Sequence, residues 1–193
     1  MRPIAIIGGA FDPVTLGHLE LIEVVEREGM TAVCLPCGDR HSFDKQMLPA
    51  AHRVELLRLA IGPREICQIE IDHGTFRAAD TYPHLLAKYG SIIWVIGSDN
   101  ANCMDRWHQG ERLKQIIPFL VVARIGHPLT VGGEWCLAKP HRYIGAGVVR
   151  EVSSTMARQL MAQRDWTQLR TVLPPAVADR IQARGWYADG TGP

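Results

Sequence analysis

The sequence predicts an α/β fold, a Rossmann-like doubly wound parallel sheet with helices on both faces. Short apolar runs rich in branched residues recur along the chain, segments with helical spacing lie between them, and glycines follow those segments. Strands that alternate with helices in this way form parallel sheets that are covered on both sides. Ligands of such sheets bind outside the carboxyl ends of the strands.

The expected strands are the apolar runs themselves, which are short and rich in branched side chains. They cover residues 4–7, 31–35, 66–71, 92–96, 119–123 and, as a sixth strand, 144–149. We expect these strands to be buried.

The expected helices lie between the strands, where apolar residues recur on one helical face. Those positions are Leu19, Ile22, Val25, Val54, Leu57, Ile61, Leu85 and Leu86. Glycine after the last turn and proline in the first turn are common end signals of helices. We assign these signals to Gly29, Gly62, Gly90, Pro49 and Pro83.

Helical spacing returns after Ser153 and over residues 175–184, where Gly185 is expected to end the last helix and Trp186 and Tyr187 to begin the tail. No repeat, linker or low-complexity segment divides the chain. We therefore expect a single domain over residues 1–193, with a C-terminal helical part from about residue 153.

Composition narrows the class of protein and of ligand. A net charge of +1 with 21% charged residues disfavours a nucleic-acid polymer as partner and fits a small anionic ligand. The five cysteines indicate reduced thiols, and the first residues lack a secretory apolar segment. No apolar run reaches the roughly 18 to 20 residues that cross a bilayer. We expect a cytoplasmic protein without a membrane partner, and homo-oligomerisation is left open.

The segment between the first strand and the first helix, residues 8–18, has the features of a phosphate-binding loop. Adjacent glycines let the backbone approach a ligand, and the following helix offers unpaired N–H groups and the positive end of its dipole. Neither Gly-Lys-Ser/Thr nor Gly-x-Gly-x-x-Gly is present, which disfavours the usual kinases and dehydrogenases. Thr15-x-Gly17-His18 places an imidazole near the same phosphates. Phe11 and Asp12 are equally compatible with ligand contact and with packing or turn roles.

A second candidate anion site is Val152-Ser153-Ser154-Thr155, which opens a helical pattern that contains Arg158. Helical geometry can bring the guanidinium of Arg158 onto the same side as Ser154 and Thr155. Hydroxyls, helix N–H groups and a forked cation would then converge, which suits a triphosphate tail. Simple capping of the helix is the competing interpretation.

Together the two segments resemble the T/HxGH and Ile-Ser-Ser-Thr-x-x-Arg motifs of the nucleotidyltransferase superfamily, with Val152 in place of isoleucine. Gly97-x-Asp99 at a strand end, followed eight residues later by Trp107, resembles the nicotinate/nicotinamide mononucleotide adenylyltransferase family. Similarity continues in His52-Arg53, Asp80-Thr81, residues 122–126 and residues 173–187, and so covers nearly the whole chain.

The resemblance implies a nucleotidyltransferase that joins the adenylyl group of ATP to nicotinate or nicotinamide mononucleotide in NAD biosynthesis and releases pyrophosphate. The implied catalytic residues are Thr15, His18 and Arg158. The implied ATP-binding residues are Gly8, Gly9, Ala10, Phe11, His18, Gly97, Asp99, Ser153, Ser154, Thr155 and Arg158. The implied acceptor-binding residues are Asp12, Lys45, Thr81, Asp99, Trp107 and Arg124.

In adenylyl transfer the attacking phosphate oxygen is already ionised, so alignment and charge dispersal matter more than a general base. We expect Mg²⁺ to arrive with ATP, held by its oxygens and by water, and expect no metal site built from the chain. Cys34-Leu-Pro-Cys37 has the spacing of a redox motif or half a zinc site, but no second pair completes it and Gly38-Asp39 follows. We interpret it as structural or incidental.

Two segments depart from the family at the acceptor side. Residues 37–45 replace a Pro-Pro-His-Lys loop, so that Lys45 or Arg40 aligns only loosely with the family lysine, and residues 76–79 replace a Ser-Tyr-Thr run. Two alternatives therefore remain: another phosphorylated acceptor such as phosphopantetheine, and a nucleotide-binding regulator without turnover.

Overall fold

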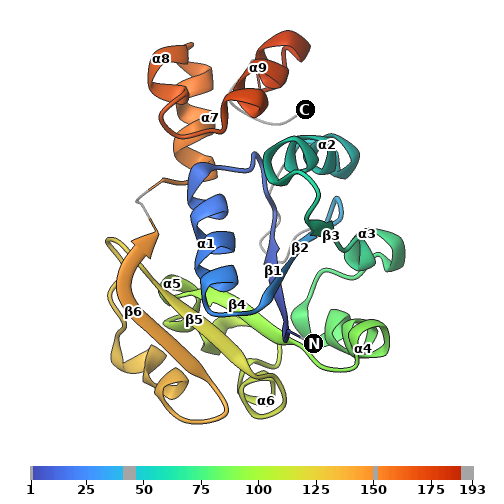
Figure 1. The fold of residues 1–193 in the computed structure, drawn as a ribbon, viewed down its shortest axis with the longest axis vertical. Coiled ribbons are helices and arrows are strands. Elements are labelled where there is room, and N and C mark those ends of the chain that lie inside the picture. Colours follow the sequence, from blue (N-terminus) through green and yellow to red (C-terminus); the bar gives the residue numbers. More distant parts are fainter. Residues whose placement is uncertain (1, 41–46, 150–151, 188–193) are drawn as a thin grey trace.

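The computed structural model describes residues 2–40, 47–149 and 152–187. Its centre is a six-stranded sheet in the order β3-β2-β1-β4-β5-β6, in which all neighbouring strands are parallel (Figure 1). The strands are β1 Ile4–Gly9, β2 Thr31–Pro36, β3 Glu65–Ile66, β4 Ile93–Gly97, β5 Phe119–Arg124 and β6 Arg142–Val149. Because β1 pairs with both β2 and β4, the strand order reverses between β1 and β4.

The helices lie between the strands and after the last of them, as alternation predicts. The elements between strands are α1 Leu16–Arg27, α2 Ala50–Ile61, α3 Ile69–His73, α4 Ala78–Tyr89, α5 Ser98–Ala101, α6 Gly110–Ile116 and the 3-10 segments η1 Met104–Arg106 and η2 Val131–Leu137. The C-terminal helices are α7 Ser154–Ala162, α8 Trp166–Leu169 and α9 Pro175–Arg184. The expected glycine stops after α1, α2, α4 and α9 are confirmed, since each of those glycines has a positive φ that side-chain-bearing residues rarely adopt.

Each face of the sheet has its own apolar core, because successive strand residues point to opposite faces. On one face Ile7 and Val95 pack with α1, α2 and the C-terminal helices. On the other face Ile6, Val33 and Ile96 pack with α4 and α6. The doubly wound architecture with helices on both faces is therefore confirmed.

The expected strand over residues 66–71 is wrong. β3 ends at Ile66, and the chain enters the short helix α3 at Ile69. A short apolar run does not by itself distinguish a buried strand from a buried helix. In the structure Ile69 and Glu70 are both buried, and Gly74 ends the helix in a left-handed conformation.

Pro83 is not in the first turn of its helix, as expected, but inside α4. The helix begins earlier, at Ala78, directly after the extended residue Arg77. A proline at this depth removes one backbone hydrogen bond. Burial of Tyr82 and Leu85 on either side of it holds the helix against the sheet.

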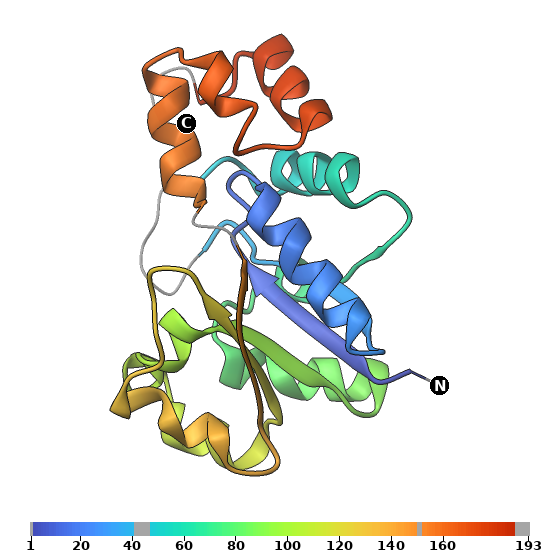
Figure 2. The same ribbon diagram turned by 60° about the vertical axis from the view of Figure 1, so that its left-hand side comes forward.

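The C-terminal helices lie beyond the carboxyl end of β1, next to the start of α1 (Figure 2). The Leu16 N–H donates to the Val172 carbonyl at 2.9 Å. Trp186 and Tyr187, which follow Gly185 at the end of α9, pack against the protein instead of beginning a free tail: the ring centres of Trp186 and His52 lie 4.5 Å apart, and Tyr187 is 2% exposed. In the described part of the chain, no helix combines the length and apolar character needed to cross a membrane.

Candidate active site

A cavity of about 730 Å³ opens at the carboxyl ends of β1 and β4, where the strand order reverses. This is the position at which open α/β sheets bind ligands. Fifteen of the predicted site residues line it, namely Gly8, Gly9, Ala10, Phe11, Asp12, Thr15, His18, Gly97, Asp99, Trp107, Arg124, Ser153, Ser154, Thr155 and Arg158. Lys45 lies outside the described residues, and Thr81 does not line the cavity.

His18 is oriented by Thr15 at the start of α1. The Thr15 backbone N–H donates to His18 Nδ1 at 2.9 Å, and the Thr15 hydroxyl lies 2.9 Å from the same nitrogen. Because Nδ1 accepts this bond, the neutral ring carries its proton on Nε2. Thr15 is 1% exposed, and its side chain and that of His18 form a capping box at the start of α1, in which each accepts a bond from the other residue's backbone N–H. The structure therefore gives Thr15 an orienting role.

Burial is the main cause that lowers the pKa of His18 to about 4, and the nearby Arg124 cation lowers it further. The left-handed residue Phe11, with φ 49°, packs its ring 4.9 Å from the imidazole. His18 in the ligand-free protein is thus a neutral ring with one N–H donor.

This protonation state predicts a pH-dependent contribution to stability. The folded protein binds fewer protons at His18 than the unfolded chain, because the pKa is about 4 in the fold and 6.5 outside it. The contribution is complete above pH 6.5 and is lost as the pH falls toward 4, by about 3 kcal/mol at most. His18→Gln removes the titration and keeps an acceptor for the Thr15 N–H.

We expect the unfolding free energy of His18→Gln, measured by urea denaturation, to rise relative to wild type as the pH falls from 7 to 4. A wild-type-minus-variant difference that stays constant over this range would contradict the neutral assignment.

Helix α7 brings the second predicted anion site to the same cavity. Ser153 caps the helix, since its hydroxyl accepts from the Met156 N–H at 3.1 Å, and Ser154 donates to the Pro13 carbonyl at 2.9 Å. Arg158 Nη2 lies 3.4 Å from Thr155 Oγ1, which confirms that the two side chains lie on the same side of the helix. His18 and Arg158 therefore face one cavity from two different helix starts.

Asp99 and Arg124 close the sheet side of the cavity. They form an ion pair at 2.9 Å, and both side chains are about a quarter exposed. Gly97 precedes them at the end of β4, where a Cβ atom would overlap the Asp99 carboxylate. The absence of a side chain at residue 97 therefore allows Asp99 to turn back toward the cavity.

Trp107, Phe76 and the charged residues Arg77 and Arg106 also line the cavity. The guanidinium carbons of Arg40 and Arg77 lie 4.6 Å and 5.1 Å from the Phe76 ring centre. The lining thus combines flat rings with cations, a combination that suits a planar anionic ligand.

The predicted contact of Thr81 with the acceptor is not supported by its position. Thr81 is fully buried, and its hydroxyl lies 2.9 Å from the carboxyl of Glu70. Glu70 lines the cavity in its place, and burial raises its pKa to about 7. The sequence offered no signal for this pairing, because the segment of Glu70 was assigned to a strand.

Two further residues that organise the site were not predicted. Arg53 is fully buried and binds backbone carbonyls of the loops after β1 and β2, and Tyr187 donates to Asp12 at 2.6 Å. The signal for Arg53 was present: it shares the buried face of α2 with Leu56 and Leu57. A cation on an apolar helical face usually has buried partners.

The two cysteines of the Cys-x-x-Cys segment are free and buried. Burial raises the pKa of Cys34 to about 12 and also raises that of Cys37, which makes both poor thiolates. Among the described residues, no cluster of three or more His, Cys, Asp or Glu side chains could hold a metal ion. These observations favour the structural interpretation of the segment.

Several known proteins are similar to this chain. The model of the cytidylyltransferase-like family matches residues 6–160. A protein of Stenotrophomonas maltophilia named "Probable nicotinate-nucleotide adenylyltransferase" is 32% identical over 95% of this chain and 96% of its own length. A protein of Roseiflexus with the same name is also 32% identical, over 96% of this chain and 98% of its own.

Solved structures agree on the fold. Nicotinic acid mononucleotide adenylyltransferase of Plasmodium falciparum, complexed with NaAD, superposes with a TM-score of 0.79 at 19% identity and covers 97% of this chain and 98% of its own. The same enzyme complexed with APC gives a TM-score of 0.69 at 18% identity over the same shares.

Proposed function

This chain belongs to the nicotinate-nucleotide adenylyltransferase family of cytidylyltransferase-like proteins, and on that premise we propose that it transfers the adenylyl group of ATP to nicotinate mononucleotide. The products are the dinucleotide of NAD biosynthesis and pyrophosphate. One observation carries the proposal: an imidazole at the start of α1 and a guanidinium in the first turns of α7 line one cavity.

Positioning and charge dispersal supply the catalysis. The helix starts and the Gly8 and Gly9 backbone receive the triphosphate, with Arg158 at its distal end and the His18 Nε2–H directed to the α- and β-phosphates. The acceptor phosphate already carries its negative charge, so no base has to remove a proton from it. The site needs only to hold the attacking oxygen in line with the α-phosphate.

Asp99 and Trp107 are assigned to the ribose and the pyridine ring. An aspartate at the carboxyl end of a strand can accept bonds from ribose hydroxyls, and a tryptophan face suits an electron-poor ring. Arg77 and Arg106 line the same cavity as Trp107, and their charges favour the acid form of the pyridine over the amide.

Magnesium enters this proposal with ATP. The carboxylates of Asp12 and Asp99 at the cavity each face an arginine, which leaves a divalent ion to phosphate oxygens and water. Bound there, Mg²⁺ would disperse charge that passes to the leaving pyrophosphate.

The test is pyrophosphate release by the purified chain with ATP, Mg²⁺ and one acceptor at a time. We expect release with nicotinate mononucleotide, much less with nicotinamide mononucleotide and none with phosphopantetheine, and we expect chelation of Mg²⁺ to abolish it. ATP binding without release from any acceptor would contradict the proposal and favour a regulator. Release only with phosphopantetheine would favour the other acceptor class.

The other predictions from the sequence concern the protein as a whole. The sequence predicts a single domain over the full length and a cytoplasmic location, and these stay predictions. Homo-oligomerisation stays an alternative that the sequence allows.

A further inference from the structure

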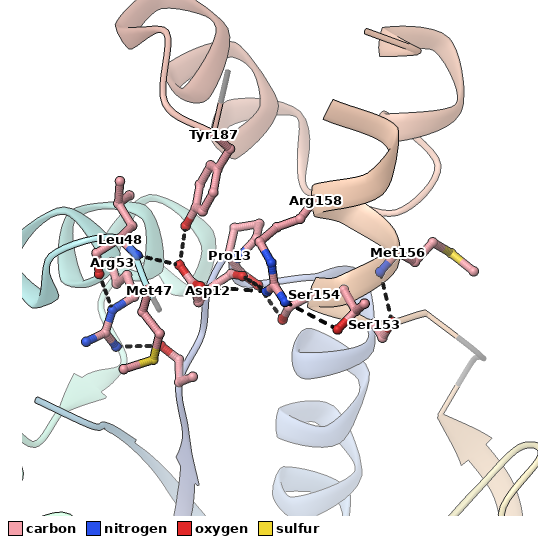
Figure 3. Close-up of polar contacts among 12 residues, drawn as sticks. Asp12, Pro13, Met47, Leu48, Arg53, Ser153, Ser154, Met156, Arg158 and Tyr187 are labelled. Atoms are coloured by element: carbon pink, nitrogen blue, oxygen red, sulfur yellow. Dashed lines mark hydrogen bonds and ion pairs between the residues drawn. The ribbon is translucent and has the colours of Figure 1, made fainter. Parts of the chain in front are cut away.

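Asp12 joins three segments that are far apart in the sequence (Figure 3). Its Oδ1 accepts from the Tyr187 hydroxyl at 2.6 Å and from the Leu48 N–H at 3.1 Å, and its Oδ2 lies 3.6 Å from Arg158 Nη1. The residue is 2% exposed. These partners occupy the carboxylate inside the protein, which argues against the predicted direct contact of Asp12 with the acceptor.

Asp12 also binds Arg158 through its backbone carbonyl. Arg158 Nη1 donates to the Asp12 carbonyl at 2.7 Å, while the Arg158 side chain remains 23% exposed at the wall of the cavity. A guanidinium has five N–H donors in a fixed plane, so fixing one nitrogen also fixes the direction of the others. The position of Asp12 therefore sets the direction in which Arg158 presents its charge.

Tyr187 determines how the Asp12 carboxylate is turned. Burial and the neighbouring Asp12 charge raise the pKa of the phenol, which keeps it a donor. With Oδ1 held by the phenol and by the Leu48 N–H, the carboxylate plane is fixed and Oδ2 faces Arg158. Stacking of Trp186 on His52 anchors the segment that delivers the phenol.

We propose that Tyr187 is a positioning residue for the reaction: through the Asp12 carboxylate it fixes the Arg158 guanidinium that receives the triphosphate. The inference rests on the proposed function only in that Arg158 contacts ATP. A purely structural role for Tyr187 makes a different prediction, since loss of packing would weaken both substrates alike and would not depend on Arg158.

The test is a double-mutant cycle on the binding of Mg·ATP by the full chain, measured by titration calorimetry. Tyr187→Phe removes only the hydroxyl, and we expect it to weaken Mg·ATP binding about three- to tenfold, since a hydrogen bond to a charged group is lost. In an Arg158→Ala background the same change should have no further effect. The KM of the acceptor should change less than twofold.

Tyr82→Phe is the matched control. Tyr82 is also buried and donates a single hydrogen bond, to the Ile116 carbonyl at 2.9 Å, but it does not line the cavity. We expect it to lower the unfolding midpoint and leave Mg·ATP binding unchanged. If Tyr187→Phe does not fold, Asp12→Asn decides, because it keeps the Oδ1 acceptor and removes the charge that faces Arg158. It should weaken Mg·ATP in the same Arg158-dependent way.

The proposal is overturned if either variant leaves Mg·ATP binding unchanged, weakens ATP and acceptor equally, or has the same effect with and without Arg158. Failure of the proposed function looks different. In that case wild type binds Mg·ATP but makes no dinucleotide, and the binding cycle still tests Tyr187. A wild type that does not bind Mg·ATP overturns both.

Discussion

Replacing His18 with alanine is expected to lower turnover about 10²- to 10³-fold and to weaken ATP binding only a few-fold. The imidazole presents one N–H donor to the phosphates, and the charge on the oxygen that leaves with pyrophosphate grows as the reaction proceeds. A donor aimed at developing charge stabilises the transition state more than the bound substrate. The Thr15 N–H that orients the ring loses its acceptor in the variant, which adds to the loss of rate.

The measurement is a steady-state comparison of kcat and the KM of ATP, read from pyrophosphate release. His127→Ala is the control, because His127 is exposed and does not line the cavity. It should have wild-type kinetics. An unchanged kcat in His18→Ala, or a loss confined to the KM of ATP, would remove His18 from the transition state.

Replacing Arg53 with methionine is expected to lower the free energy of unfolding by about 3–5 kcal/mol, because each buried carbonyl that loses its donor costs about 1–3 kcal/mol. The guanidinium donates to the carbonyls of Ala10, Cys37, Gly38 and Leu48 at 2.6–2.9 Å and is fully buried. Methionine fills a similar volume but leaves these buried carbonyls without their donor. The two loops that Arg53 joins follow β1 and β2, so the phosphate-binding loop should loosen as well.

Urea denaturation of wild type and variant at pH 7 measures the loss. Arg58→Met in the same helix is the control, because Arg58 is exposed and contacts one carbonyl at the surface. It should cost less than about 1 kcal/mol. An equal effect of the two substitutions would mean that the carbonyl contacts of Arg53 add nothing to the stability of the fold.

Most of the architecture followed from local sequence signals. Apolar runs, helical spacing and the glycines after helices were enough for five of the strands and for the principal helices. The segment around Ile69 was assigned wrongly because a run of six residues has no decisive period. Pro83 was misplaced because the helix starts earlier than its proline suggests, and tertiary burial of its neighbours outweighs the cost of an interior proline.

In the candidate site, too, some features followed from local sequence signals and others depended on tertiary packing. The backbone at a strand end, the start of a helix and the residues one turn apart on it are local features, so the sequence by itself determined the phosphate loop, His18 and the group around Arg158. Only the tertiary structure decided what each side chain faces. Thr81 is turned to Glu70, Arg53 to four carbonyls and Tyr187 to Asp12, which is 175 residues away in the sequence. Such contacts depend on how distant segments pack against one another, and side-chain spacing along the chain carries no information about that packing.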